Sequence, residues 1–577
     1  MKKKVLPALI VTGLIILVVI IMGITALINK YTPTKKTEDL KEYFNISSDD
    51  EAALIVDNEL SDYKAKIIDD KVYVDYRFVH DSLNSRFYWD ANENVLLYTT
   101  ASDIISAAAD SNSYSVTKQT NDFGYPIVKA TSDSALIALD YVKQYSNITF
   151  KSYDDPARVV ITSKWDEIDS ATVSKSTQVR VKGGIKSPIL KQVKKNDTLT
   201  ILDSGDKWDK VATEDGIIGY IKNKAMSESK KTKLTNPDYE EETFTHIKKD
   251  KDICLAWNQV TSRSANSKVA QVISSTKGIN VMSPTWFYLN DNNGNLADIA
   301  SKDYVSYCHS QGIEVWGLFS NFENTDVDAA YVLTHTSTRT TLINQIMSAA
   351  FNYELDGVNI DFENITEAAY GDSYIEFIRE LAIKCHNNGI SLSVDVTVPA
   401  SFNKFFNRSD MANFADYIVI MGYDEHYMGS DAGSVSSIPW VTEGVEATLK
   451  EVPADQIILG MPFYTRIWEL TPKEDDDAVT DTEDQSKYTV ASQVYGMDAA
   501  AAQLATNNAT ASLDEESGQN YAEWSASNKL YKVWLEDSTS LEKRLKLVDD
   551  NKLAGAAFWK LGFENSSVWD TVIKYLD

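Results

Sequence analysis

The chain has 577 residues, with 56 Lys and Arg against 84 Asp and Glu, and a formal net charge of −28. This charge argues against nucleic acid, or another anionic polymer, as a partner held by bulk electrostatics. Cys254, Cys308 and Cys385 have no metal-ligand spacing and lie in apolar patterns, so each is expected as a small core residue rather than part of a disulfide framework.

An uncharged apolar stretch from Val5 to Asn29 is long enough to cross a bilayer as a helix. We interpret it as an uncleaved transmembrane anchor, because it is longer than a signal-peptide core; the alternative is a signal cleaved near Ile24-Thr25-Ala26. Lysines within residues 1–4 keep that end in the cytoplasm by the positive-inside rule. The remainder is therefore predicted outside the cell membrane, at a bacterial cell surface.

Two small β-rich domains are predicted after this anchor. Between residues 45 and 165, runs such as Lys71–Val74 and Val95–Thr99 indicate strands alternating with a short helix. They resemble the N-terminal domain named after copper amine oxidases, and the resemblance implies no copper site here. Residues 172–228 hold short β runs whose order resembles a bacterial Src-homology-3-like barrel. A plain β spacer without a ligand is the alternative for this second domain.

The C-terminal part, residues 240–577, contains eight short apolar runs separated by helical stretches. This α/β alternation predicts a (β/α)8 TIM barrel. One helical stretch, Ser373–Asn387, has an apolar face, and Gly312 and Gly389 lie where two helices should end. The predicted strands are Ile253–Trp257, Ile279–Tyr288, Ile313–Phe319, Leu355–Glu363, Ile390–Val398, Tyr417–Tyr423, Gln456–Tyr464 and Ala554–Leu561.

An insertion of about residues 470–535 separates the last two predicted strands. Its acidic run, Glu474 to Asp484, is expected to be a solvated loop. Nearby aromatic residues could instead form the wall of a substrate groove; they are Tyr488, Tyr495, Tyr521 and Trp524.

The fourth predicted strand ends in acidic residues. In Leu355–Glu363 the period of two places Asn359, Asp361 and Glu363 on one face of a hydrophobic strand. Barrels of this kind keep catalytic groups at the carboxyl ends of their strands. Two carboxylates this close raise the pKa of one of them, so that it can hold a proton near neutral pH. The alternative is a solvated acidic turn.

This segment, Asp356-x-x-Asn359-x-Asp361-x-Glu363, resembles the signature strand of glycoside hydrolase family 18, the chitinases and related N-acetylglucosaminidases. The family pattern is Asp-x-x-Asp-x-Asp-x-Glu, so Asn359 departs from it in the manner of the cell-wall and spore-cortex branch. Three further segments resemble family strand ends in the same order: Met421–Asp424, Gly460–Tyr464 and the segment around Trp559.

The resemblance implies a substrate-assisted glycosidase that needs no cofactor or metal. Glu363 would be the general acid and base, and Asp361 would orient the substrate's acetamido group. Tyr423 would bond that group and Asp424 would hold the distorted sugar. Substrate-binding roles are implied for Trp559, Asn359, Asp356 and Tyr464.

The predicted partner is peptidoglycan or another N-acetylglucosamine polymer. The Src-homology-like region, the anchor and Asn359 favour peptidoglycan over chitin. A chitinase is the alternative enzyme, and a non-catalytic glycan-binding protein is the alternative from another class. Because an amide cannot share a proton as the family's aspartate does, Asn359 predicts a shifted acid limb in the pH profile.

Overall fold

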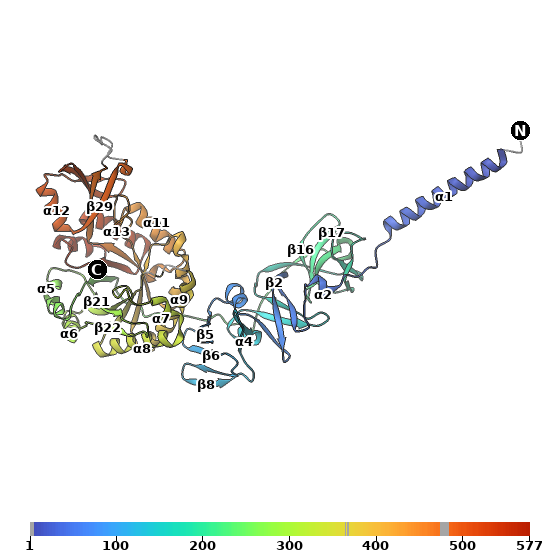
Figure 1. Ribbon diagram of the computed structural model, residues 1–577, viewed down its shortest axis with the longest axis horizontal. Coiled ribbons are helices and arrows are strands. Elements are labelled where there is room, and N and C mark those ends of the chain that lie inside the picture. Colours follow the sequence, from blue (N-terminus) through green and yellow to red (C-terminus); the bar gives the residue numbers. More distant parts are fainter. Residues whose placement is uncertain (1–4, 364, 366–367, 474–483, 577) are drawn as a thin grey trace. The chain divides into compact units, whose positions relative to one another are not determined.

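The structure is a computed structural model that describes residues 5–363, 365, 368–473 and 484–576 (Figure 1). The chain divides into two compact units, which are described separately. Unit 1 comprises Met1–Trp89, Ala107–Tyr114 and Asn121–Glu241. Unit 2 comprises Asp90–Ser106, Ser115–Thr120 and Glu242–Asp577.

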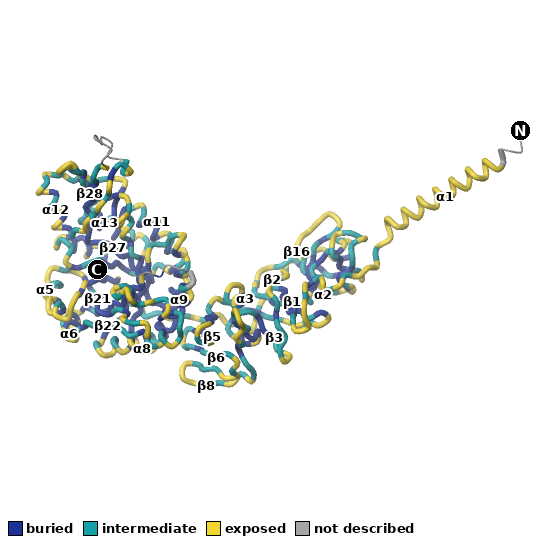
Figure 2. The backbone as a smooth tube through the Cα atoms, viewed as in Figure 1, coloured by how far each residue is buried: buried dark blue, intermediate teal, exposed yellow. Residues whose placement is uncertain are grey.

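Unit 1 begins with the long helix α1 (Val5–Tyr31), which is exposed along its described side chains (Figure 2). From Pro7 to Tyr31 it is long and apolar enough to cross a membrane, and no second helix in the described part of the chain meets that test. The predicted anchor therefore corresponds to one continuous helix.

The rest of unit 1 is built from two seven-stranded sheets that share an apolar core, in which Ile55 of the first sheet packs with Val179 and Val211 of the second. The first sheet has the order β11 (Thr149–Tyr153), β12 (Arg158–Thr162), β1 (Glu51–Val56), β2 (Glu59–Ile68), β3 (Lys71–Asp75), β10 (Ala135–Ala138) and β9 (Val128–Ala130). The second has the order β15 (Ile189–Val193), β14 (Thr177–Arg180), β18 (Ile218–Lys222), β17 (Trp208–Thr213), β16 (Thr198–Asp203), β13 (Glu167–Thr172) and β19 (Lys230–Lys233). Short helices α2 (Leu40–Tyr43), α3 (Tyr76–Phe78) and α4 (Leu139–Tyr145) accompany them.

Unit 2 includes a segment from far upstream in the sequence. Residues Asp90–Ser106 contribute to a five-stranded sheet of order β4 (Phe87–Asp90), β5 (Val95–Thr99), β6 (Ile104–Ala108), β7 (Ser113–Val116) and β8 (Gln119–Asp122). Within unit 2, the Thr99 hydroxyl donates to Glu376 Oε1 at 2.7 Å, and Asp90 Oδ2 accepts from the Thr336 backbone N–H at 2.7 Å. This upstream segment is therefore hydrogen-bonded to the helices that surround the barrel.

The described residues of unit 2 form a closed parallel barrel of eight strands, each close to a predicted run. The strands are β20 (Ile253–Asn258), β21 (Val281–Leu289), β23 (Glu314–Ser320), β24 (Gly357–Asp361), β25 (Ser391–Thr397), β26 (Tyr417–Met421), β27 (Ile457–Pro462) and β33 (Gly555–Trp559). β33 pairs with both β20 and β27, and β20 pairs with β21, which closes the barrel. The predicted TIM barrel is confirmed.

Helices surround the barrel, and the strands between them are buried (Figure 2). Apolar side chains fill the barrel interior, among them Leu318, Val419 and Ile458. Gly312 and Gly389 follow helices α6 and α9 with φ of +74° and +68°, a left-handed conformation that suits glycine, as predicted. The helices are α5 (Val269–Ile273), α6 (Lys302–Ser310), α7 (Ala329–Thr334), α8 (Thr336–Tyr353), α9 (Ala368–His386), α10 (Arg408–Phe414), α11 (Ile438–Thr448), α13 (Ser538–Asn551) and α14 (Trp569–Val572).

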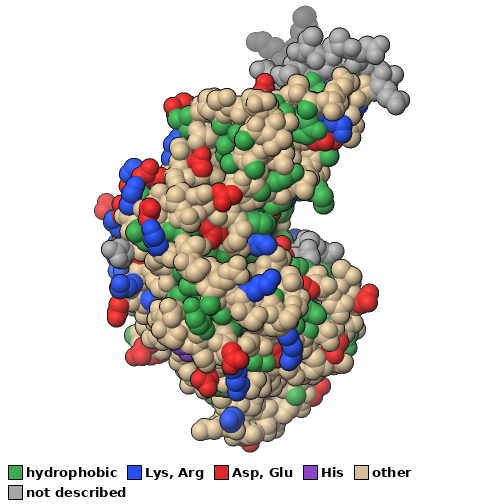
Figure 3. Space-filling model, turned by 90° about the vertical axis from the view of Figure 1, so that its left-hand side faces the viewer, with side chains coloured by type: hydrophobic (Ala, Val, Ile, Leu, Met, Phe, Trp, Pro, Cys, Tyr) green, Lys and Arg blue, Asp and Glu red, His purple; other side chains and the backbone are tan. Residues whose placement is uncertain are grey.

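An antiparallel sheet with one helix, α12 (Met497–Thr506), lies between β27 and β33 in the sequence. Its order is β29 (Tyr488–Gly496), β28 (Tyr464–Pro472), β32 (Lys529–Leu535), β31 (Gln519–Ala526) and β30 (Ser512–Asp514). Of the acidic run Glu474 to Asp484, only Asp484 is within the described residues. Charged side chains of both signs are scattered over the face of the molecule in Figure 3.

Candidate active site

Strand β24 brings the predicted acidic residues to the carboxyl end of the barrel. The strand begins in close contact with Trp316 of β23: a Cβ atom added to Gly357 would lie 2.5 Å from Trp316 Cδ1. The strand ends at Asp361, so Glu363 lies two residues beyond the strand, whereas the sequence prediction placed it on the strand. Asp361 is 6% exposed, whereas Glu363 is exposed. One carboxyl group is therefore enclosed and the other reaches solvent.

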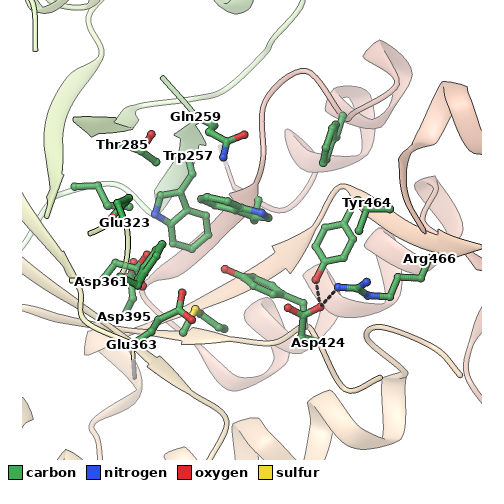
Figure 4. Close-up of a pocket in the computed structure, with 17 residues that line it drawn as sticks. Trp257, Gln259, Thr285, Glu323, Asp361, Glu363, Asp395, Asp424, Tyr464 and Arg466 are labelled. Carbon is green, nitrogen blue, oxygen red and sulfur yellow. Dashed lines mark hydrogen bonds and ion pairs between the residues drawn. The ribbon is translucent and has the colours of Figure 1, made fainter. Parts of the chain in front are cut away.

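Both carboxyl groups line a cavity of about 300 Å³ (Figure 4). Among the described lining residues, every barrel strand except β27 contributes to it, together with β28 of the inserted sheet. Its described lining residues are Trp257, Gln259, Thr285, Leu318, Phe322, Glu323, Asp361, Glu363, Asp395, Met421, Tyr423, Asp424, Tyr464, Arg466, Val494, Trp559 and Phe563. The structure thus brings together Asp361, Glu363, Tyr423, Asp424, Tyr464 and Trp559 of the predicted site.

Asp361 has a second buried carboxyl neighbour, Asp395 on β25, which is 3% exposed. Burial raises the pKa of Asp361 well above its usual range, and the charges of Asp395, Glu363 and Glu323 raise it further. Burial also raises the pKa of Asp395. Asp361 Oδ1 accepts no hydrogen bond within the described part of the chain. This oxygen is buried without a described partner, and repulsion between the two neighbouring carboxylates favours keeping one of them protonated.

Glu363 lies at the mouth of the same cavity. Partial removal from water raises the pKa of Glu363, and the negative charges of Asp424 and Glu323 raise it further. A raised carboxyl pKa keeps more of the protonated form near neutral pH, which is the form that can donate a proton. Glu323 is itself held by the Ser320 hydroxyl, at 2.6 Å from each carboxylate oxygen.

Aromatic rings form an apolar surface beside the acids. Trp257 and Trp559 meet edge to face with centroids 5.9 Å apart, and Trp257 meets Tyr423 in the same way at 6.5 Å. Tyr423 in turn contacts Tyr464, at 6.2 Å between centroids. Such faces suit the apolar side of a sugar ring. They line the same cavity as the carboxyl groups.

Asp424 is held from the opposite side of the cavity (Figure 4). The Tyr464 hydroxyl donates to Asp424 Oδ1 at 2.5 Å, and Arg466 Nη2 lies 3.5 Å from the same oxygen. Figure 4 shows Asp361 and Glu363 on one side and Tyr464 and Arg466 on the other. Tyr464 therefore lines the site, and its hydroxyl holds the Asp424 carboxylate in place.

Two predicted substrate-binding residues do not line this cavity. Asn359 is fully buried beneath it, where its side chain bonds Trp257, Ser283, Ser393 and Asp395. The prediction was wrong because the alternation along β24 that places Asp361 at the barrel mouth places Asn359 one step deeper.

Asp356 precedes β24, at the opposite end of the strand from the cavity. Its Oδ2 accepts hydrogen bonds from the Val315 backbone N–H and from His309 Nε2, both at 2.8 Å. Its predicted contact with substrate is therefore corrected to a structural role that joins β24 to β23.

Sequence reasoning missed Asp395, Trp257, Glu323 and Arg466. Asp395 had a signal, since it is an acid inside the apolar run Ser391–Thr397, as Asp361 is inside its own run. Arg466 had none, because it comes from the inserted sheet. None of the four aromatic residues offered as an alternative groove wall lines this cavity; Tyr495 and Trp524 line a different one, beside α12.

Paired carboxyl groups at the mouth of a TIM barrel, beside an aromatic floor, are the arrangement of a glycoside hydrolase. The chain belongs to glycosyl hydrolases family 18, whose family model matches residues 217–564, more than half of the chain. The resemblance of the two upstream regions to named modules stays a prediction.

Relatives share this part of the chain. YvbX of Bacillus subtilis (strain 168), described as an uncharacterized glycosylase, is 22% identical over 346 residues, which are 56% of this chain and 95% of YvbX. The cortical fragment-lytic enzyme of the same strain is 24% identical over 287 residues, 48% of this chain and 63% of that enzyme. A solved C-terminal domain described as that of a chitinase, from Desulfitobacterium hafniense DCB-2, has a TM-score of 0.50 and 19% identity, covering 57% of this chain and 100% of that domain. That likeness supports the fold.

Proposed function

We propose that this glycoside hydrolase cleaves bonds at N-acetylglucosamine in peptidoglycan by substrate-assisted, retaining catalysis. The observation that carries the proposal is the pair of different carboxyl groups on one cavity: Asp361 enclosed next to Asp395, and Glu363 at the mouth. One can bind and stabilise a positive group while the other exchanges protons with the substrate and water.

In the first step, protonated Glu363 donates its proton to the glycosidic oxygen as the bond to the anomeric carbon breaks. The carbonyl oxygen of the substrate's own 2-acetamido group forms the new bond to that carbon, which yields a cyclic oxazolinium ion. The Asp361 carboxylate is proposed to accept the acetamido N–H and to offset the positive charge; the lack of a described partner for its Oδ1 supports this role.

In the second step, the Glu363 carboxylate takes a proton from water as the water oxygen attacks the anomeric carbon. The bond to the acetamido oxygen breaks, which restores the acetamide and the original configuration of the sugar. Glu363 ends the cycle protonated. The raised pKa of Glu363 supports both halves of this exchange near neutral pH.

The remaining lining residues hold the sugar. Trp559 and Trp257 provide the apolar surface on which the ring packs, and the Tyr423 hydroxyl is proposed to donate to the acetamido oxygen. Asp424, fixed by Tyr464 and Arg466, is proposed to accept from a sugar hydroxyl. A side chain held at a set position orients substrate without losing rotamer freedom on binding.

The choice of peptidoglycan over chitin is supported by one relative and by the N-terminal helix. That relative is named as a cortical fragment-lytic enzyme. Helix α1 is proposed to anchor the chain in the cell membrane, with the catalytic unit outside. An enzyme tethered there meets the polymer that surrounds the membrane. Chitin is the alternative substrate.

Digestion by the detergent-solubilised full chain, beside its Glu363→Gln variant, tests the proposal. Purified peptidoglycan and chitin oligomers are the substrates, and mass spectrometry identifies the new reducing ends. We expect N-acetylglucosamine ends from peptidoglycan that disappear in the variant. Cleavage of chitin alone would make the enzyme a chitinase, and binding without cleavage would make it a glycan-binding protein.

A further inference from the structure

A second cavity of about 350 Å³ lies beside the first and shares Phe322 with it. It is formed by the segment after β23, by α7 and by the beginning of α9. Besides Phe322, the lining residues that matter here are Asn324, Thr325, Asp328, Ala330 and Tyr370. Its volume is in the range of small-molecule sites.

The second cavity is joined to the active site on the side of Glu363. Asn321, which lines the second cavity and is 6% exposed, donates from Nδ2 to the Glu363 backbone carbonyl at 3.1 Å. A general acid protonates the oxygen of the leaving sugar, so that sugar must bind next to Glu363. The rings that hold the attacked sugar in the proposed function, Trp257, Tyr423 and Trp559, do not line the second cavity, so we place it on the side of the leaving sugar.

Among the described lining residues, Asp328 is the only charged one. Phe322, Ala330 and Tyr370 offer carbon surface, and Asn324 and Thr325 carry an amide and a hydroxyl. Its described residues include no Lys or Arg. A free carboxylate would meet Asp328 here, with Glu323 in the adjoining cavity, and would find no cation among the described lining residues of this cavity. A neutral branch with methyl and amide groups fits better.

The leaving sugar in peptidoglycan carries such a branch. When cleavage follows N-acetylglucosamine, the leaving sugar is N-acetylmuramic acid, whose lactyl ether is amide-linked to a peptide. Chitin has no branch at that position, and a glycan stripped of its peptides has a lactyl carboxylate. We propose that the second cavity receives the lactyl group and the first residue of the attached peptide. This inference rests on the proposed function.

Three tetrasaccharides test it: one from peptidoglycan with its peptides, the same after enzymatic removal of the peptides, and the chitin tetrasaccharide. We expect the wild-type kcat/KM to be at least tenfold higher for the first than for the second. Ala330→Trp fills the cavity, and Thr325→Trp adds the same ring at its exposed rim, where folding is not at risk. Each should lower the ratio of kcat/KM for the peptide-bearing glycan to that for chitin at least tenfold.

Asp326→Trp is the matched control, since Asp326 is exposed, adjoins Thr325 and is not among the residues that line the cavity. It should change the ratio by less than twofold. An unchanged ratio in Thr325→Trp, or equal wild-type rates on the two peptidoglycan fragments, would overturn the inference while leaving peptidoglycan cleavage established. Wild-type cleavage of chitin alone would overturn both proposals.

Discussion

Asn359→Asp restores the family's usual acid at a position that the structure has adapted to an amide. All four hydrogen-bonding positions of the Asn359 carboxamide are used. Oδ1 accepts from Trp257 Nε1 at 3.0 Å and from Ser283 Oγ at 2.9 Å. Nδ2 donates to Ser393 Oγ at 3.0 Å and to Asp395 Oδ1 at 2.7 Å. An aspartate keeps the two accepted bonds and loses both donors unless it is protonated.

The magnitude follows from these bonds. In the Asn359→Asp variant, the protonated carboxyl group at this position donates one bond and loses one, which costs about 1 kcal/mol of folding free energy. In the folded variant, the carboxyl groups at positions 359 and 395 together bind one more proton than they bind in the unfolded chain. Because the carboxyl pKa is raised on folding, stability is highest at low pH and falls as pH rises. The loss is about 1.4 kcal/mol per pH unit, or about 3 kcal/mol between pH 5 and pH 7 relative to wild type.

The same charge change should appear in catalysis. A further acid beside Asp395 raises the pKa at which the buried cluster ionises, so the acid limb of kcat/KM should move to higher pH. Urea unfolding at pH 5 and pH 7, and a fluorogenic N-acetylglucosamine oligomer for rates, measure both effects. Asn359→Ala adds no titratable group and only removes the bond that lowers the pKa of Asp395, so its loss of stability between pH 5 and pH 7 should be smaller than that of Asn359→Asp. Wild-type pH dependence of both stability and kcat/KM in Asn359→Asp would refute the reasoning.

Asp395→Asn should act in the opposite direction, because it removes a charge that raises the pKa of Asp361. The acid limb of kcat/KM should move to lower pH, and a shift to higher pH would contradict this. Arg544→Met leaves the fully buried Glu536 carboxylate without its ion-pair partner, which contacts it at 2.7 Å. The variant should lower the unfolding free energy of unit 2 by about 3–5 kcal/mol. Lys546→Met breaks an exposed pair and should leave the urea midpoint unchanged; equal midpoints for the two variants would count against the buried pair. For helix α1, we expect the full chain in the membrane fraction of cells with unit 2 open to added protease; a soluble full chain or a protected unit 2 would argue against the anchor.

The sequence by itself determined the barrel strands and the acidic end of β24. Apolar residues recur with a period of two along strands and 3.6 along helices, and neighbouring residues are enough to show this period. All eight strands were therefore predicted within a few residues. Gly312 and Gly389 marked helix ends because only local backbone geometry was needed. The acid at Glu363 was likewise readable, since it follows a strand whose carboxyl end must lie at the barrel mouth.

Only the tertiary structure decided which side chains meet. Asp395 neighbours Asp361 because β25 pairs with β24 in one register, in which Asn359 faces Ser393. Arg466 reaches Asp424 because the inserted sheet folds over the barrel mouth. Asp361 lies at the cavity, whereas Asn359 and Asp356 lie below it because they come earlier along the strand direction. Pairing, register and depth arise from contacts between residues far apart in the sequence, and no local period carries that information.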